Sequence, residues 1–131
     1  MRKVKTTPVL RQSADEHKPK TIIIRNSDGT FVFKQEEIVS IEACNNQVCF
    51  HVLAGGLTVP KIVVSLSLSK TEAILNHLPF MRVHRSWIIN LAHVRAHLTK
   101  DGHSIETVTS QHIPVANSHS EQFVVAFEQF Y

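Results

Sequence analysis

Residues 80–90, with the sequence FMRVHRSWIIN, form the stretch that decides the fold. Phe80 and Val83 begin it as a short strand, and two isoleucines follow a polar interruption. Apolar side chains on both sides of the interruption predict that the stretch is anchored in a core. The polar side chains between these anchors would then be held on a fixed support. They are Arg82, His84, Arg85 and Ser86.

The chain before this stretch is predicted to form short strands separated by turns. Asn26-Ser27-Asp28-Gly29 is typical of a hairpin, and Asn45-Asn46 and Gly55-Gly56 mark two later turns, because these residues tolerate a positive φ. The segments between them are rich in β-branched and aromatic residues, as strands are. The expected strands cover residues 21–25, 30–34, 37–43, 47–53 and 57–64.

Two of these strands have a more detailed pattern. In residues 37–43 only the face with Val39, Ile41 and Ala43 is consistently apolar, which predicts a half-buried strand. Pro60 lacks the N–H that a ladder needs, so residues 57–64 are predicted to lie at a sheet edge or to contain a bulge.

The first predicted helix begins at Ser69 and Glu72, which have capping-box spacing, and it runs to Leu78 before Pro79. Strands are then expected to follow, with a hairpin turn at Asp101-Gly102. They cover residues 80–83, 93–99, 103–109 and 111–115.

The last 14 residues, 118–131, are predicted to form the second helix, which also begins with capping-box spacing. Phe123, Phe127 and Phe130 lie on one helical stripe, which favours a core or dimer face over a ligand site. Together these patterns predict an all-β dominated fold with about nine or ten short strands and two short helices in one domain.

Composition excludes several classes of protein. The chain has 131 residues, 43% hydrophobic and 19% charged, as expected of one globular domain. No apolar run is long enough to cross a membrane, and the first 20 residues lack the apolar core of a secretory signal. The sequence contains no nucleophile elbow, phosphate loop or triad pattern. It therefore predicts a cytoplasmic protein that is neither an enzyme nor membrane-bound.

Charge is distributed unevenly along the chain. Residues 1–20 carry a net charge of +4, and residues 21–131 carry −1. The first part is therefore predicted to be a flexible basic tail or linker and the second part to be the folded domain.

The histidines and cysteines do not predict a cofactor. His93 and His97 are four residues apart, but on a strand that spacing does not converge on one ion, so no metal is expected. Cys44 and Cys49 are expected to be free thiols. They flank a turn, and two interpretations remain open for them: small buried side chains, or a pair that forms a disulfide across the hairpin.

Residues 80–90 closely resemble the Phe-x-Arg-Val-His-Arg-Ser segment of the LytTR family of DNA-binding domains, with Trp87 in place of the usual Tyr or Phe. Further family features follow in order over residues 30–125. They are Ile41-Glu42 before a polar turn, Ser67-Leu68 opening a helix that ends at Leu78-Pro79, and Ile113-Pro114-Val115 near the end.

The resemblance implies an elongated β fold that reads duplex DNA with three loops in successive major grooves. It implies a bacterial transcription regulator, or the output domain of a two-component response regulator, that binds promoter repeats in pairs. A sensor kinase or another signalling partner would then act through a separate domain or protein. The loops fall at Asn45-Asn46-Gln47, at Arg85 and at Ala116-Asn117-Ser118, where the family commonly has Ser-Arg-Arg.

The chemistry of these loops suits DNA. Arg85 can present two donors to guanine, and Asn or Gln can pair with adenine, so Asn45, Asn46, Gln47 and Asn117 are candidates. Arg82, His84, Ser86 and Ser118 are candidates for further base or phosphate contacts.

Second interpretations remain open for these residues. Arg82 can pair with a carboxylate such as Glu42, His84 can cap a turn, and Asn45-Asn46 can be only a turn. The competing function is a non-catalytic β domain that dimerises or binds protein.

Overall fold

The computed structural model describes residues 20–75, 77 and 79–131, so the predicted tail over residues 1–20 lies almost wholly outside the described part. The described chain forms ten strands, two α-helices and two short 3-10 helices. The elements are β1 (Thr21–Asn26), β2 (Gly29–Lys34), η1 (Gln35–Glu37), β3 (Ile38–Cys44), β4 (Gln47–Ala54), β5 (Leu57–Val64), α2 (Leu68–Ile74), β6 (Phe80–His84), β7 (Trp87–Asn90), η2 (Leu91–His93), β8 (Val94–Leu98), β9 (Ser104–Thr107), β10 (His112–Pro114) and α3 (Asn117–Phe130).

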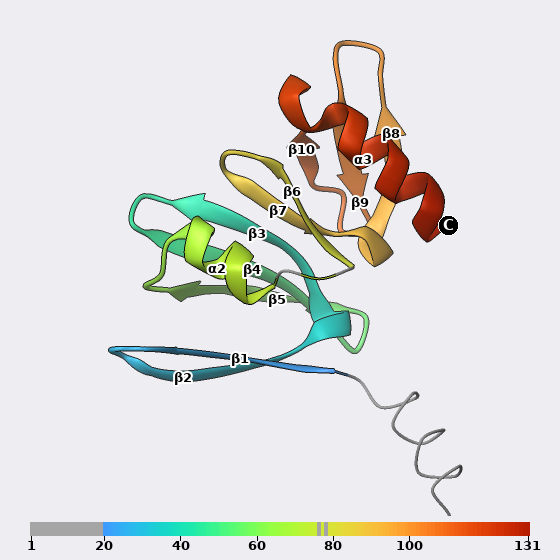
Figure 1. The fold of residues 1–131 in the computed structure, drawn as a ribbon. Helices are drawn as coiled ribbons and strands as arrows, with labels where there is room; N and C mark the ends of the chain where they lie inside the picture. Colours follow the sequence, from blue (N-terminus) through green and yellow to red (C-terminus); the bar gives the residue numbers. More distant parts are fainter. Residues whose placement is uncertain (1–19, 76, 78) are drawn as a thin grey trace, which may run out of the picture.

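The strands form three sheets in the described part of the chain. β1 pairs with β2, five strands run in the order β5-β4-β3-β7-β6, and three run in the order β10-β9-β8. All of these pairings are antiparallel. Figure 1 shows the β1–β2 hairpin at one end, the five-stranded sheet in the middle, and the smaller sheet with α3 at the other end. The predicted β-dominated fold with two helices is therefore confirmed.

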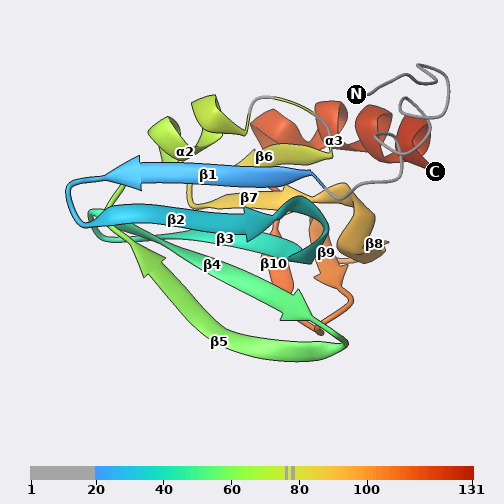
Figure 2. The ribbon, with the colours of Figure 1, turned by 90° about the horizontal axis from the view of Figure 1, so that it is seen from below.

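Two separate cores hold the layers together, and the β6–β7 hairpin contributes to both. Phe80 and Ile88 join the first core, which includes Phe33 of β2 and the residues of α2 that face the sheet. Val83 and Ile89 join the second core, which includes Phe123 of α3. Figure 2 shows α2 and α3 along the same side of the sheets. Burial on both faces fixes β6 and β7 in the middle of the molecule.

The predicted turns are present. Asn26 Oδ1 accepts the N–H groups of Asp28 and Gly29 at 2.8 and 3.2 Å, which closes the β1–β2 turn. Asn45 adopts a φ of 60°, a left-handed conformation that asparagine tolerates better than most residues. Pro60 lies in β5, an edge strand, beside a register shift between Phe50 and Val52, so both parts of that prediction are confirmed.

The prediction of a half-buried strand over 37–43 is wrong. Ile38, Val39, Ser40 and Ile41 are all buried, because a bulge between Ile38 and Ser40 interrupts the alternation of faces. The buried Ser40 hydroxyl donates to Gln111 Oε1 at 2.7 Å. β3 is the central strand of the five-stranded sheet, and it buries side chains on both faces of that sheet.

The predicted first residues of both helices are corrected. Ser67 caps α2, as the family resemblance implied and not Ser69 as the capping-box spacing predicted: its backbone is extended, and its hydroxyl accepts the Lys70 N–H at 3.1 Å. α2 ends at Ile74, before the predicted Leu78, which lies outside the described residues. α3 begins with Ala116 at its N-cap and has no side-chain cap, so Ser118 is within the first turn. The strand β7 was not predicted, because Trp87–Asn90 is short.

The side chain of Asn90 links the end of β7 to η1 and β3. Its Nδ2 donates to the Ile38 carbonyl at 2.9 Å and the Gln35 carbonyl at 3.3 Å, and its Oδ1 accepts the Ala92 N–H at 2.9 Å. Asn90→Ala leaves buried polar groups unpaired and should lower the free energy of unfolding by roughly 2 kcal/mol in urea titration. The matched change Asn117→Ala, at an exposed position, should cost less than about 0.5 kcal/mol. Equal losses for the two variants would contradict this assignment.

Candidate nucleic-acid interface

The β6–β7 turn is held from within by Arg82. Its Nε donates to the His84 carbonyl at 3.0 Å and its Nη2 to the Arg85 carbonyl at 2.7 Å. Its Nη1 pairs with Glu72 Oε1 of α2 at 2.9 Å, and the Arg82 side chain is only 19% exposed. All three guanidinium nitrogens thus have partners inside the protein. The predicted pairing of Arg82 with a carboxylate is confirmed, although that carboxylate is Glu72; Glu42 lies 3.2 Å from His51 instead.

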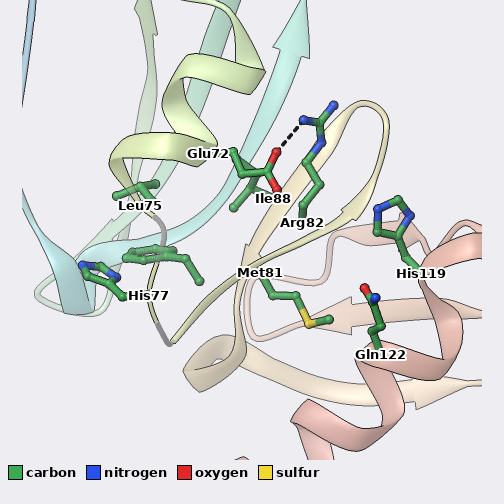
Figure 3. Close-up of a pocket in the computed structure, with 9 residues that line it drawn as sticks. Glu72, Leu75, His77, Met81, Arg82, Ile88, His119 and Gln122 are labelled. Atoms are coloured by element: carbon green, nitrogen blue, oxygen red, sulfur yellow. Dashed lines mark hydrogen bonds and ion pairs between the residues drawn. The ribbon is translucent and has the colours of Figure 1, made fainter.

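A pocket of about 250 Å³ lies between α2, β6 and the start of α3. Figure 3 shows the Glu72–Arg82 ion pair that links α2 to the β6–β7 turn beside this pocket. The Glu72–Arg82 pair lies on one side of the pocket, and His119 and Gln122 of α3 lie on the other. Glu72 and His119 were not recognisable as part of this site from the residue pattern, because their proximity to the turn arises only in the tertiary fold.

His84 caps the same turn. Its Nδ1 accepts the Ser86 N–H at 3.1 Å, so Nδ1 must be unprotonated for this bond to form. Burial, and the positive charges of Arg85, His119 and Arg82, lower the pKa of His84 from its usual 6.5. The predicted role of His84 in a turn is confirmed, and the imidazole is stabilised in its neutral form.

Arg85 stands at the tip of this turn. It is exposed, and its guanidinium has no hydrogen-bond or ion-pair partner among the described residues. Arg82 anchors only the main-chain carbonyl of Arg85. The turn therefore presents a cation with all its donors free on a firmly held backbone.

The β3–β4 turn is joined to the β6–β7 turn by the main chain. The Ala43 N–H donates to the Ser86 carbonyl at 2.8 Å, one residue before β3 ends. Asn45, Asn46 and Gln47 are exposed beyond this bond, and Gln47 Nε2 lies 3.5 Å from Ser65 Oγ. The amide side chains are therefore accessible beside the Arg85 turn.

The start of α3 is joined to the β6–β7 hairpin on the other side. The Ala116 N–H donates to the Val83 carbonyl at 2.9 Å. Asn117 and Ser118 follow as exposed residues of the first helical turn, and Ser118 Oγ lies 3.2 Å from His119 Nδ1. Figure 1 shows the β3–β4 turn, the β6–β7 turn and the first turn of α3 in succession along one side of the molecule. The structure thus brings the three predicted loops together.

The other candidate residues are separate from this edge. His93 Nε2 contacts the Glu36 carbonyl at 2.6 Å, whereas His97 Nε2 lies 3.0 Å from His103 Nδ1. In the described part of the chain, no group of three or more His, Cys, Asp or Glu residues is placed to hold a metal. No described helix is long and apolar enough to span a membrane.

Comparison with known proteins agrees with this architecture. The family model of the LytTr DNA-binding domain matches residues 28–128. The chain belongs to the LytTR family of DNA-binding domains. This is a DNA-binding and not a catalytic family.

A solved structure has the same fold as this LytTR domain. It is the LytTr DNA-binding domain of a methyl-accepting/DNA response regulator from Bacillus cereus, with a TM-score of 0.65 and 20% identity. The match covers 83% of this chain and 96% of that chain. No curated protein matches the sequence.

The capping role of His84 predicts a pH dependence of stability. Because its pKa is lowered in the folded state, the unfolded chain binds more protons below pH 6.5. The contribution of His84 is thus fully present above that pH and is lost as the pH falls toward the lowered pKa. His84→Asn keeps an acceptor oxygen but does not titrate.

Urea titration at about pH 7.5 and 5.5 should therefore show a smaller loss of stability for His84→Asn than for the unmodified chain. His97, whose burial also lowers its pKa, is present in both proteins and cancels in the comparison. Identical losses in the two proteins would show that His84 is not held neutral by the turn.

Proposed function

We propose that this LytTR domain reads duplex DNA in a sequence-specific manner with its three joined turns, placed in successive major grooves. The observation that supports the proposal most directly is the pair of main-chain hydrogen bonds that fix the outer turns to the β6–β7 hairpin, Ala43 to Ser86 and Ala116 to Val83. Rigid spacing of the reading groups is what recognition of a DNA sequence requires.

In this proposal Arg85 occupies the middle position and binds guanine. A guanidinium can donate to guanine O6 and N7 at once, and that of Arg85 is exposed and free. Asn46 and Gln47 on one side and Asn117 on the other offer amide groups that match adenine. Asn45, Ser86 and Ser118 are placed for secondary base or phosphate contacts.

Arg82 and His84 take a different part in the proposal. Arg82 Nε and Nη2 and His84 Nδ1 bind the main chain of the turn, so in this proposal the two residues act on DNA through the position of Arg85. Glu72 belongs with them, because it orients the Arg82 guanidinium from α2. We propose these three as positioning residues.

The net charge of the folded domain affects the salt dependence of DNA binding and the number of copies needed. Residues 21–131 carry a net charge of −1, so few phosphates can be neutralised by one copy and salt should weaken binding only gradually. We propose that two copies bind repeated promoter sites in the bacterial cytoplasm. The input would come from a sensor kinase or another signalling partner through a separate domain or protein.

The competing interpretation, an interaction module built on the aromatic stripe of α3, has less support. Phe123 is fully buried, and Phe127 is partly buried against the same core. Tyr131, which follows the helix, donates its hydroxyl to the Leu91 carbonyl at 2.8 Å. Most of the stripe is thus used within the domain.

Selection from a random duplex library with the purified chain should yield an enriched motif at moderate salt. Arg85→Ala should then weaken binding to the selected duplex by roughly 1–3 kcal/mol and relax the preference at one base pair. Electrophoretic or fluorescence titration measures both effects.

Lys70→Ala is the matched control, because Lys70 is an exposed cation in the first turn of α2. This variant should leave the selected motif unchanged. The absence of any enriched motif would contradict DNA reading. An equal loss of affinity for all duplexes with Arg85→Ala would show a phosphate contact in place of a base contact.

A further inference from the structure

The β3–β4 hairpin carries two thiols on one face, next to its turn. The strand register places Glu42 opposite Cys49 and Cys44 opposite Gln47, so the two cysteines are diagonal neighbours. Both are free, and their Sγ atoms are 2.8 Å apart. A disulfide has its sulfurs about 2.05 Å apart, so the two side chains need to approach by less than about 1 Å.

The residues between the cysteines are those of the proposed reading turn. Asn45, Asn46 and Gln47 lie between Cys44 and Cys49 in the sequence, together with one buried valine. A bond between Cys44 and Cys49 would therefore close a small ring around the whole turn. No other turn of the proposed reading edge contains a cysteine.

We infer that Cys44 and Cys49 form a dithiol–disulfide site that reacts with low-molecular-weight disulfides, and that its oxidation weakens DNA reading by the β3–β4 turn. The second half of this inference rests on the proposed function. The first half depends only on the geometry of the hairpin.

The reaction is a pair of thiol–disulfide exchanges. The Cys44 thiolate, formed by loss of its proton to solvent, attacks one sulfur of oxidised glutathione and releases glutathione thiolate, which takes up a proton. Cys49 then loses its proton and attacks the Cys44 sulfur, releasing the second glutathione. The protein loses two electrons and two protons, and one glutathione disulfide becomes two thiols.

Exposure decides the order of the two steps. Cys44 is partly exposed, whereas Cys49 is 2% exposed, so Cys44 meets the oxidant first. The hydrogen bond with Cys49, burial, and the negative charge of Glu42 raise the pKa of Cys44 to about 11. Little thiolate is present near neutral pH, so exchange is slow and follows sustained changes in the thiol–disulfide balance.

The bond should alter the turn because it joins diagonal positions. In an antiparallel pair, diagonal neighbours lie farther apart than directly opposed residues, so drawing them together increases the local twist. Base reading depends on hydrogen bonds within a narrow range of distances, so a shift of the Asn46 and Gln47 amides weakens it.

The neighbouring Trp87 reports this change without DNA. It lies opposite Glu42 in the adjacent strand and stacks on His51 of β4, with ring centroids 5.8 Å apart. It is also the only tryptophan of the chain. A change in the twist of the hairpin should therefore shift its fluorescence.

The test compares the full chain in dithiothreitol and after incubation with oxidised glutathione. Intact mass should show the loss of two hydrogens with no glutathione adduct, and the Trp87 emission should shift. The Kd for the selected duplex should rise about tenfold, the discrimination carried by one good base contact, and dithiothreitol should restore it. Cys44→Ser, which removes the thiol that meets the oxidant first, should bind DNA equally with and without oxidant. Cys49→Ala, which lacks the second thiol, should stop at the glutathione adduct on Cys44 and form no intramolecular bond.

Two results would overturn the inference. One is a chain that forms only a mixed disulfide or none, and the other is a Cys44–Cys49 bond that leaves the Kd unchanged. If the reduced chain selects no DNA, the proposed function fails and the control of DNA reading fails with it. The mass and the Trp87 emission then still decide whether the dithiol site exists.

Discussion

Burial of the β6–β7 hairpin on both faces is the constraint on which the rest of the structure depends. Phe80 and Ile88 enter one core, while Val83 and Ile89 enter the other. Each such side chain stabilises the fold by about 1.5–3 kcal/mol when it is fully buried. A slip of one residue in either strand would exchange the two sets of side chains, so the register is strongly fixed. The position of Arg85 at the turn follows from that register.

Local signals made much of the fold predictable. The turn at Asn45 was evident from the sequence because asparagine tolerates a positive φ. The place of Pro60 in an edge strand with a bulge was evident because proline lacks the N–H that a ladder needs. The burial of Ser40 was not, because a bulge changes which face a residue occupies, and simple alternation does not reveal a bulge. The cap of α2 was misassigned by local spacing because Ser69 and Glu72 are separated as in a capping box, although the helix already begins at Leu68.

The candidate site was predictable to the level of the loops and no further. The resemblance to the LytTR family indicated the three turns, and the structure places them along one edge. The sequence did not show which residues of the Arg82–Ser86 segment hold the turn and which are left free. The roles depend on two turn carbonyls that require donors and on Glu72, ten residues from Arg82 in the sequence. The two cysteines were recognisable as neighbours across a hairpin, but their 2.8 Å separation required the register.

Amide chemical-shift mapping is the most direct test of whether one rigid edge of the domain contacts DNA. The ¹⁵N-labelled chain should be titrated with the selected duplex and with an unrelated duplex of the same length. The selected duplex should shift the amides of Asn46, Gln47, Arg85, Ser86 and Asn117 together. Shifts confined to the C-terminal end of α3 or to the β1–β2 hairpin, with these amides unchanged, would contradict it.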